Sequence, residues 1–121
     1  MVWEVRLHTD FQEDLIRFEP AVRIGIFANM TLLETFGPQL GRPYVDTLKG
    51  SQYANMKELR ITVPDGEWRV AFAFDPRRAA ILLVAGNKAG VSQSMFYRRL
   101  IRDADRRYRE HLQSLDKGST E

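Results

Sequence analysis

The sequence KELRITVPDGEWRVAFAF, residues 57–74, alternates apolar and polar side chains on both sides of a short turn. Strict alternation of this kind predicts a β-strand in each half. The proline, aspartate and glycine between the halves are strong turn residues, so the two strands should pair as an antiparallel hairpin. We therefore take this hairpin as the centre of the fold.

The hairpin brings two arginines together. When the apolar faces of the two strands are matched, Arg60 and Arg69 share the other face, opposite each other or one diagonal step apart. Like charges so placed repel, and an anion between them, most often a phosphate, relieves the repulsion. The alternative is that both arginines are solvated on an outer strand face.

The rest of the chain predicts an α+β protein. The patterns indicate a strand at 3–7, a helix at 10–18, a helix at 20–36, the hairpin, a buried strand at 80–84 and a helix from about 92 to 115. This β-α-α-β-β-β-α order predicts a mostly antiparallel sheet, with the two N-terminal helices on one face and the C-terminal helix covering the other. We expect a single domain over residues 1–115 and a frayed tail at 116–121.

Two local features concern the first helix. Asp10 and Glu13 have the spacing of a capping box at its start. His8 precedes them as a lone histidine on the polar face of the first strand, and we interpret it as structural or solvated rather than catalytic.

Composition excludes several kinds of site. The 121 residues are 44% hydrophobic and contain no cysteine, so disulfides, thiolate metal sites and cysteine nucleophiles are excluded. No apolar run approaches membrane-spanning length. We expect a cytoplasmic protein that needs neither a metal nor another cofactor and has no membrane partner.

The small net charge of +2 conceals an asymmetry. Residues 1–41 carry three arginines and six acids, whereas residues 42–109 carry fourteen lysines and arginines and only seven acids. Basic charge is thus gathered on the hairpin and the last helix, as a polyanion-binding face requires. A solvated basic helix face is the alternative source of part of this charge.

Several residues outside the hairpin are suited to binding RNA. The irregular segment 38–56 contains Lys49 beside tyrosines, a mixture that suits phosphate contact and base stacking. Tyr97, Arg98 and Arg99 lie near the start of the last helix, next to the end of a strand. We interpret these four residues as RNA-binding.

The side chains that could take part in a reaction are four cations and one phenol, namely Lys57, Arg60, Arg69, Lys88 and Tyr97. We expect them to converge at one end of the sheet. RNA cleavage by the neighbouring 2′-hydroxyl needs stabilisation of a phosphorane, a base and an acid. Arginines perform the first task well, and a lysine among cations can exchange protons near neutral pH. The patterns leave the identity of acid and base open.

The sequence resembles the RelE/HigB toxins, most of all the phage-derived HigB-like branch. The resemblance covers residues 3–115 and rests on the element order and on five short segments: Leu48-Lys-Gly50, Met56-Lys-Glu-Leu-Arg60, Trp68-Arg-Val70 with Phe72-Ala-Phe-Asp-Pro76, Gly86-Asn-Lys88 and 104–112. Unlike the histidine-using members, this chain has no histidine near these cations.

The resemblance implies the toxin of a type II toxin–antitoxin pair. Such a toxin is a ribosome-dependent endoribonuclease that cleaves messenger RNA in the ribosomal A site, inhibits translation, and is neutralised by a helix-turn-helix antitoxin. It also implies that Arg60, Arg69 and Lys88 are catalytic cations. Two alternatives remain: a module of the same fold that binds RNA or the ribosome without cutting, and an inactive phage-derived interaction protein.

Overall fold

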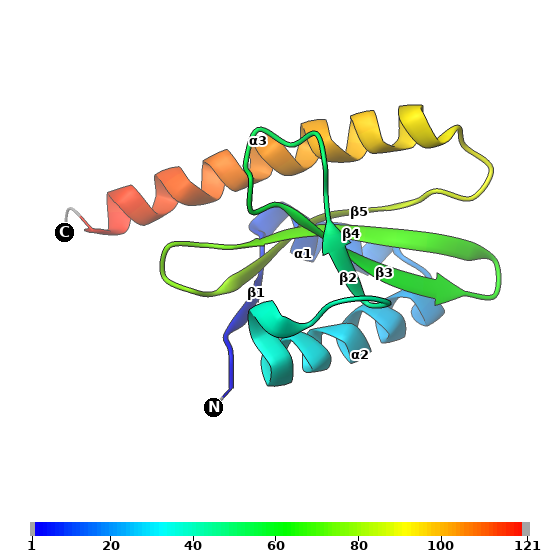
Figure 1. Ribbon diagram of the computed structural model, residues 1–121, viewed down its shortest axis with the longest axis horizontal. Coiled ribbons are helices and arrows are strands. Elements are labelled where there is room, and N and C mark those ends of the chain that lie inside the picture. The colour runs from blue at the N-terminus through cyan, green and yellow to red at the C-terminus, as the bar shows by residue number, and fades with distance from the viewer. Residues whose placement is uncertain (1, 120–121) are drawn as a thin grey trace.

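A computed structural model of the protein describes residues 2–119 and contains a five-stranded sheet covered by helices on both faces (Figure 1). The elements are β1 (Val5–Leu7), α1 (Thr9–Arg17), α2 (Pro20–Phe36), the short 3-10 helix η1 (Gly37–Gln39), β2 (Val45–Thr47), β3 (Lys57–Val63), β4 (Gly66–Phe74), β5 (Ala80–Asn87) and α3 (Gln93–Ser119). The predicted α+β class is confirmed.

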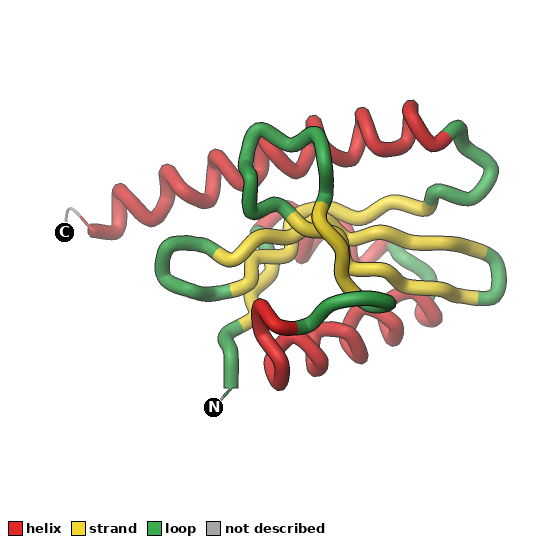
Figure 2. Tube along the Cα trace, in the orientation of Figure 1, coloured by secondary structure: helices red, strands yellow, loops and turns green. Residues whose placement is uncertain are grey.

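The sheet has the strand order β1-β5-β4-β3-β2 (Figure 2). β1 pairs in parallel with β5, and the other three pairings are antiparallel, so the prediction of a mostly antiparallel sheet is confirmed. Sequence patterns missed β2, which is only three residues long and pairs with the start of β3. Such a short edge strand has no alternation to detect.

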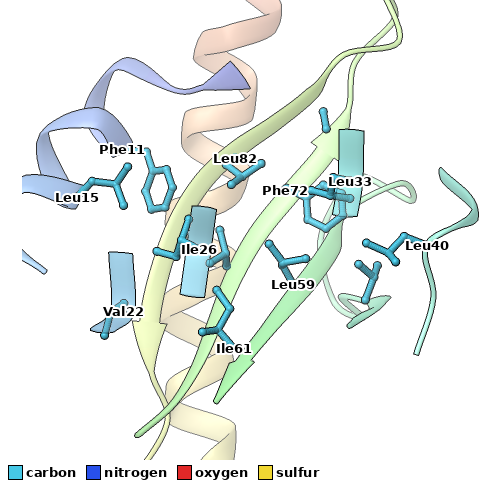
Figure 3. Packing of buried hydrophobic residues seen from close by; sticks show 13 residues of the cluster. Phe11, Leu15, Val22, Ile26, Leu33, Leu40, Leu59, Ile61, Phe72 and Leu82 are labelled. Atoms are coloured by element: carbon cyan, nitrogen blue, oxygen red, sulfur yellow. The ribbon is translucent and has the colours of Figure 1, made fainter. Parts of the chain in front are cut away.

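The first hydrophobic layer lies between the sheet and the two N-terminal helices. Phe11, Val22, Ile26 and Leu33 of the helices pack on a sheet face that includes Phe72 (Figure 3). Each of these side chains is at most 2% exposed. The predicted position of α1 and α2 on one face is therefore correct.

The second layer lies between α3 and the opposite face of the sheet. Phe96, Leu100, Ala104 and Tyr108 lie four residues apart along α3 and are all buried. The helix extends to Ser119, past the expected end at residue 115. The expected tail is thus helical as far as 119, and positions 120 and 121 lie outside the described residues.

The start of α1 departs from the predicted capping box. His8, not Asp10, is the N-cap residue, and its Nδ1 accepts a hydrogen bond of 3.1 Å from the backbone N–H of Asp10. The interpretation of His8 as structural is therefore correct. Within residues 2–119, none of the helices is both long and apolar enough to cross a membrane.

The His8 cap makes stability depend on pH. Burial lowers the pKa of His8 from its ordinary value of 6.5, because the charged imidazolium is poorly solvated there. As the pH falls below about 6.5, the unfolded chain takes up this proton first, so the folded state loses stability. Protonation of Nδ1 also removes the lone pair that caps the helix.

We expect the wild-type protein to lose more free energy of unfolding than His8→Asn between about pH 7.5 and about pH 5, because asparagine caps without titrating. Urea unfolding of both proteins at several pH values measures the difference. Parallel pH profiles for the two proteins would contradict this role of His8.

Candidate active site

The two arginines of the hairpin face each other directly. In the register of β3 and β4, Arg60 is the cross-strand partner of Arg69. Both belong to the sheet face that α3 covers, since Leu59 and Val70, their neighbours, pack into the layer beneath α1 and α2. This confirms the predicted pairing of the arginines on one face.

A buried carboxylate lies beside the arginine pair. Glu58 is 3% exposed, and its Oε2 accepts a hydrogen bond of 3.0 Å from Arg60 Nε. The same oxygen lies 3.7 Å from Arg69 Nε. Glu58 thus compensates the repulsion between the two guanidinium groups that the register creates.

Sequence reasoning missed Glu58 because an acidic residue on the polar face of a strand is normally solvated. The available signal was its position two residues before Arg60, on the same strand face, where alternation places the two side chains side by side.

The alternative of two solvated arginines is wrong for Arg69. Its side chain is only 7% exposed, and its Nη1 donates a hydrogen bond of 3.0 Å to the carbonyl of Trp68. Its buried Nε makes no hydrogen bond within the described part of the chain. A buried donor without an acceptor is costly, so Arg69 Nε has unused hydrogen-bonding capacity beside Glu58.

Arg60 is more accessible than its partner. Its side chain is 36% exposed, and its second ion pair is to Asp46 on β2, at 3.3 Å. The hydrogen bond to Glu58 raises the pKa of Arg60 further above its ordinary value, and the charge of Asp46 acts in the same direction. Arg60 is therefore charged at every relevant pH.

Tyr97 of α3 completes the group from above the sheet. Burial raises the pKa of its phenol, and a hydrogen bond with Glu58 raises it further, while a hydrogen bond with Arg69 acts in the opposite direction. The net effect keeps the phenol protonated at neutral pH. Tyr97 is thus a proton donor within reach of the arginine pair.

Two shallow cavities meet at Arg60. One of about 350 Å³ is lined by Lys49, Glu58, Arg60 and Tyr97, together with residues of β2. The other, of about 450 Å³, contains Arg60, Arg69 and Glu67 and extends along the edge of β3 towards α2. Because Arg60 lines both cavities, a strand of linked phosphates bound at Arg60 would contact both of them.

Lys88 lies at the same end of the sheet as the arginine pair. Its backbone N–H donates a 2.9 Å hydrogen bond to the carbonyl of Glu67, which continues the pairing of β4 and β5 by one residue. Gly86, two residues earlier, is the cross-strand partner of Arg69. Lys88 is thus one diagonal step from Arg69.

The structure does not bring Lys57 to the arginines. Lys57 is paired with Phe72, whose ring lies in the core beneath α1 and α2, so it belongs to the opposite face of the sheet. Arg98 and Arg99 are both exposed on α3, and Arg99 lines a separate cavity near Phe96. The expected convergence therefore fails for Lys57, while Arg98 and Arg99, which were predicted to bind RNA, lie exposed on α3.

A group of possible metal ligands lies away from the arginines. His8, Asp10 and Glu110 bring their ligand atoms within 4.8 Å of one another, beside a cavity of about 440 Å³. However, His8 Nδ1 accepts the Asp10 N–H, so in neutral His8 the proton is on Nε2. His8 therefore has no free lone pair for a metal while it caps α1.

The chain is similar in sequence to one protein family and to two proteins named as putative toxins. The profile of the family described as phage derived protein Gp49-like matches residues 13–109. Two putative toxins of Mycobacterium tuberculosis (strain ATCC 25618 / H37Rv), HigB2 and HigB3, are each 50% identical to it, over 88 and 84 residues. These alignments cover 72% and 69% of this chain, but 43% of HigB2 and 70% of HigB3.

Two solved structures share the fold. The archaeal RelE–RelB complex from Pyrococcus horikoshii OT3 matches with a TM-score of 0.54 and 17% identity, over 75% of this chain and 100% of the other. A mutant of the E. coli toxin RelE in the free state matches with a TM-score of 0.57 and 9% identity, over 84% and 95%. The chain therefore belongs to the phage-derived Gp49-like family, is related in sequence to HigB2 and HigB3, and shares the RelE fold.

The burial of Arg69 predicts an effect on stability. Arg69→Ala leaves a cavity and removes a cation from buried Glu58, so we expect it to lower the free energy of unfolding by about 1–3 kcal/mol. Arg98→Ala, at an exposed position, should change it by less than about 0.5 kcal/mol. Urea unfolding measures both, and equal stabilities of the two variants would argue against a buried ion pair.

Proposed function

We propose that this protein is the toxin of a type II toxin–antitoxin system and cleaves messenger RNA on the ribosome. The observation that carries the proposal is the pair of opposed arginines, Arg60 and Arg69, with a buried carboxylate and a protonated phenol beside them. Membership of the Gp49-like family and the sequence similarity to HigB2 and HigB3 support it.

The reaction that suits this group is attack of the 2′-hydroxyl on the adjacent phosphorus. The O2′–P bond forms, the P–O5′ bond breaks, and the products are a 2′,3′-cyclic phosphate and a 5′-hydroxyl. Arg60 and Arg69 would hold the non-bridging oxygens and stabilise the extra charge of the phosphorane. Arg69 Nε, which lies 3.7 Å from Glu58 and makes no hydrogen bond within residues 2–119, would gain an acceptor from this contact.

Two protons must move during this step. Glu58 is the carboxylate that both arginines contact, and in our scheme it accepts the proton of the 2′-hydroxyl. Tyr97 gives its proton to the departing O5′. Because Glu58 lies close enough to Tyr97 to raise the pKa of its phenol, the proton would then return from the carboxyl to the phenolate, which resets the site.

Lysines complete the proposed site. Lys49 lines the cavity of Tyr97 and Glu58, so it would bind an RNA phosphate next to the cleaved one. Lys88, one diagonal step from Arg69, would add a further positive charge at the phosphorane. Arg98 and Arg99, exposed on α3, would contact RNA or ribosome further from the reacting atoms.

The partners follow from the same proposal. The message would be presented in the ribosomal A site in the cytoplasm, and a helix-turn-helix antitoxin would neutralise the toxin. The RelE–RelB complex among the similar structures supports an antitoxin partner.

Single-turnover cleavage on programmed ribosomes tests the proposal. We expect Arg60→Ala to slow cleavage by about tenfold to a hundredfold, because it removes a charged hydrogen bond from the transition state. Arg77→Ala is the matched control, an exposed arginine in the turn after β4, and it should cleave at the wild-type rate. Cleavage is mapped by primer extension.

The same assay separates cutting from binding. A wild-type protein that stalls translation but leaves the message intact would show a binding module instead of a nuclease. A folded Arg60→Ala variant that cuts at the wild-type rate would remove the arginine pair from the reaction.

A further inference from the structure

The β2–β3 loop, residues 48–56, rises from the edge of the sheet and lies against α3 (Figures 1 and 2). Leu48 at its start is buried, and its backbone N–H donates a 3.0 Å hydrogen bond to the carbonyl of Met56 at its end. The loop is thus closed at its base, and its position depends on what its tip contacts.

The tip of the loop is bound by one carboxylate of α3. Asp105 Oδ1 accepts a 2.5 Å hydrogen bond from the Ser51 hydroxyl, and Oδ2 accepts a 3.1 Å hydrogen bond from the backbone N–H of Gln52. Ser51 Oγ in turn accepts the N–H of Tyr53 at 3.0 Å. Both carboxylate oxygens are therefore used by the loop.

The same side of α3 carries the site tyrosine. Tyr97, Ile101 and Asp105 lie four residues apart, so they form one stripe along the helix. Gly50 of the loop lies over the middle of this stripe, with a φ of +101° that favours glycine. A Cβ at Gly50 would lie 3.3 Å from Ile101 Cδ1, so the loop backbone packs closely on the helix.

Lys49 lies between this anchored tip and the site. It precedes Gly50 and lines the cavity that also contains Glu58, Arg60 and Tyr97. One helix stripe therefore places Tyr97 at the cavity from the second turn of α3 and holds the Lys49 loop from the fourth turn. Asp105 holds the tip of the loop through Ser51 and Gln52, while Tyr53 and Asn55 at the end of the loop contact Tyr108 of the same helix.

We propose that Asp105 is a positioning residue, which holds the β2–β3 loop on α3 so that Lys49 contacts the RNA bound at Arg60. The proposal rests on RNA being the ligand of the site. It assigns a specific task to one acid on a helix that is otherwise rich in arginine. Its neighbour Asp103 instead pairs with Arg102 and Arg106, at 3.2 and 3.3 Å.

Because Asp105 is negatively charged, the direction in which RNA affinity changes when it is removed tests the proposal. Removing a negative charge near an RNA site strengthens RNA binding if only long-range electrostatics matters. Loss of a positioning contact weakens binding instead. Asp105→Ala and Asp103→Ala remove the same charge from the same helix, so Asp103→Ala is the matched control.

The first measurement is the affinity for a fluorescein-labelled single-stranded oligoribonucleotide, followed by fluorescence anisotropy. We expect Asp105→Ala to bind about fivefold more weakly and Lys49→Ala about tenfold more weakly, the scale of one charged contact. Asp103→Ala should bind as tightly as the wild type or slightly more tightly. In the double variant of Lys49 and Asp105, the second change should add no further loss.

The second measurement is hydrogen exchange at the amides of Gln52 and Tyr53. Exchange should accelerate in Asp105→Ala and in Ser51→Ala but not in Asp103→Ala, while the amides of β4 remain protected. Unchanged exchange, tighter RNA binding by Asp105→Ala, or losses that multiply in the double variant would each overturn the proposal. If these results appear as expected but the wild type does not cut translated messages, the cleavage reaction fails and the role of Asp105 stands.

Discussion

The constraint on which the site depends is the cross-strand register that places Arg60 directly opposite Arg69. The core imposes this register, because a slip of one residue would turn Leu59, Ile61 and Val70 out of the layer beneath α1 and α2. Packing on one face of the sheet thus forces two like charges together on the other. Glu58 reduces the repulsion between the two arginines. The arginine pair is suited to phosphate because Arg69 Nε makes no hydrogen bond within residues 2–119.

The second face of the sheet completes the site, because α3 brings Tyr97 over the arginines while two shallow cavities leave the site open at Arg60. Gly86, the partner of Arg69 on β5, allows α3 to pack closely on the sheet, since a Cβ there would lie 3.0 Å from the ring of Phe96 on this helix. The resulting burial both excludes water from Arg69 and raises the pKa of Tyr97.

Alternation was enough to predict the hairpin and the shared face of its arginines, because apolar periodicity reports directly on which face is buried. The same alternation places Lys57 with Leu59 on the core side of β3. The prediction that Lys57 lies beside the arginines was therefore inconsistent with the strand pattern. Glu58 was missed although its hydrogen-bond partner, Arg60, is only two residues away on the same strand face. Asp105 was beyond prediction for a different reason, because it contacts a loop 53 and 54 residues away. A helical acid among arginines gives no sign of such a partner.

The central claim is that the arginine pair promotes attack by a 2′-hydroxyl, and the chemistry of the cut RNA end tests it most directly. Mass spectrometry of a short message cleaved on ribosomes should find a 2′,3′-cyclic phosphate on one product and a 5′-hydroxyl on the other. A single 2′-deoxynucleotide on the 5′ side of the cut bond should abolish cleavage there. A 3′-hydroxyl with a 5′-phosphate, or unchanged cutting beside the deoxynucleotide, would contradict the account.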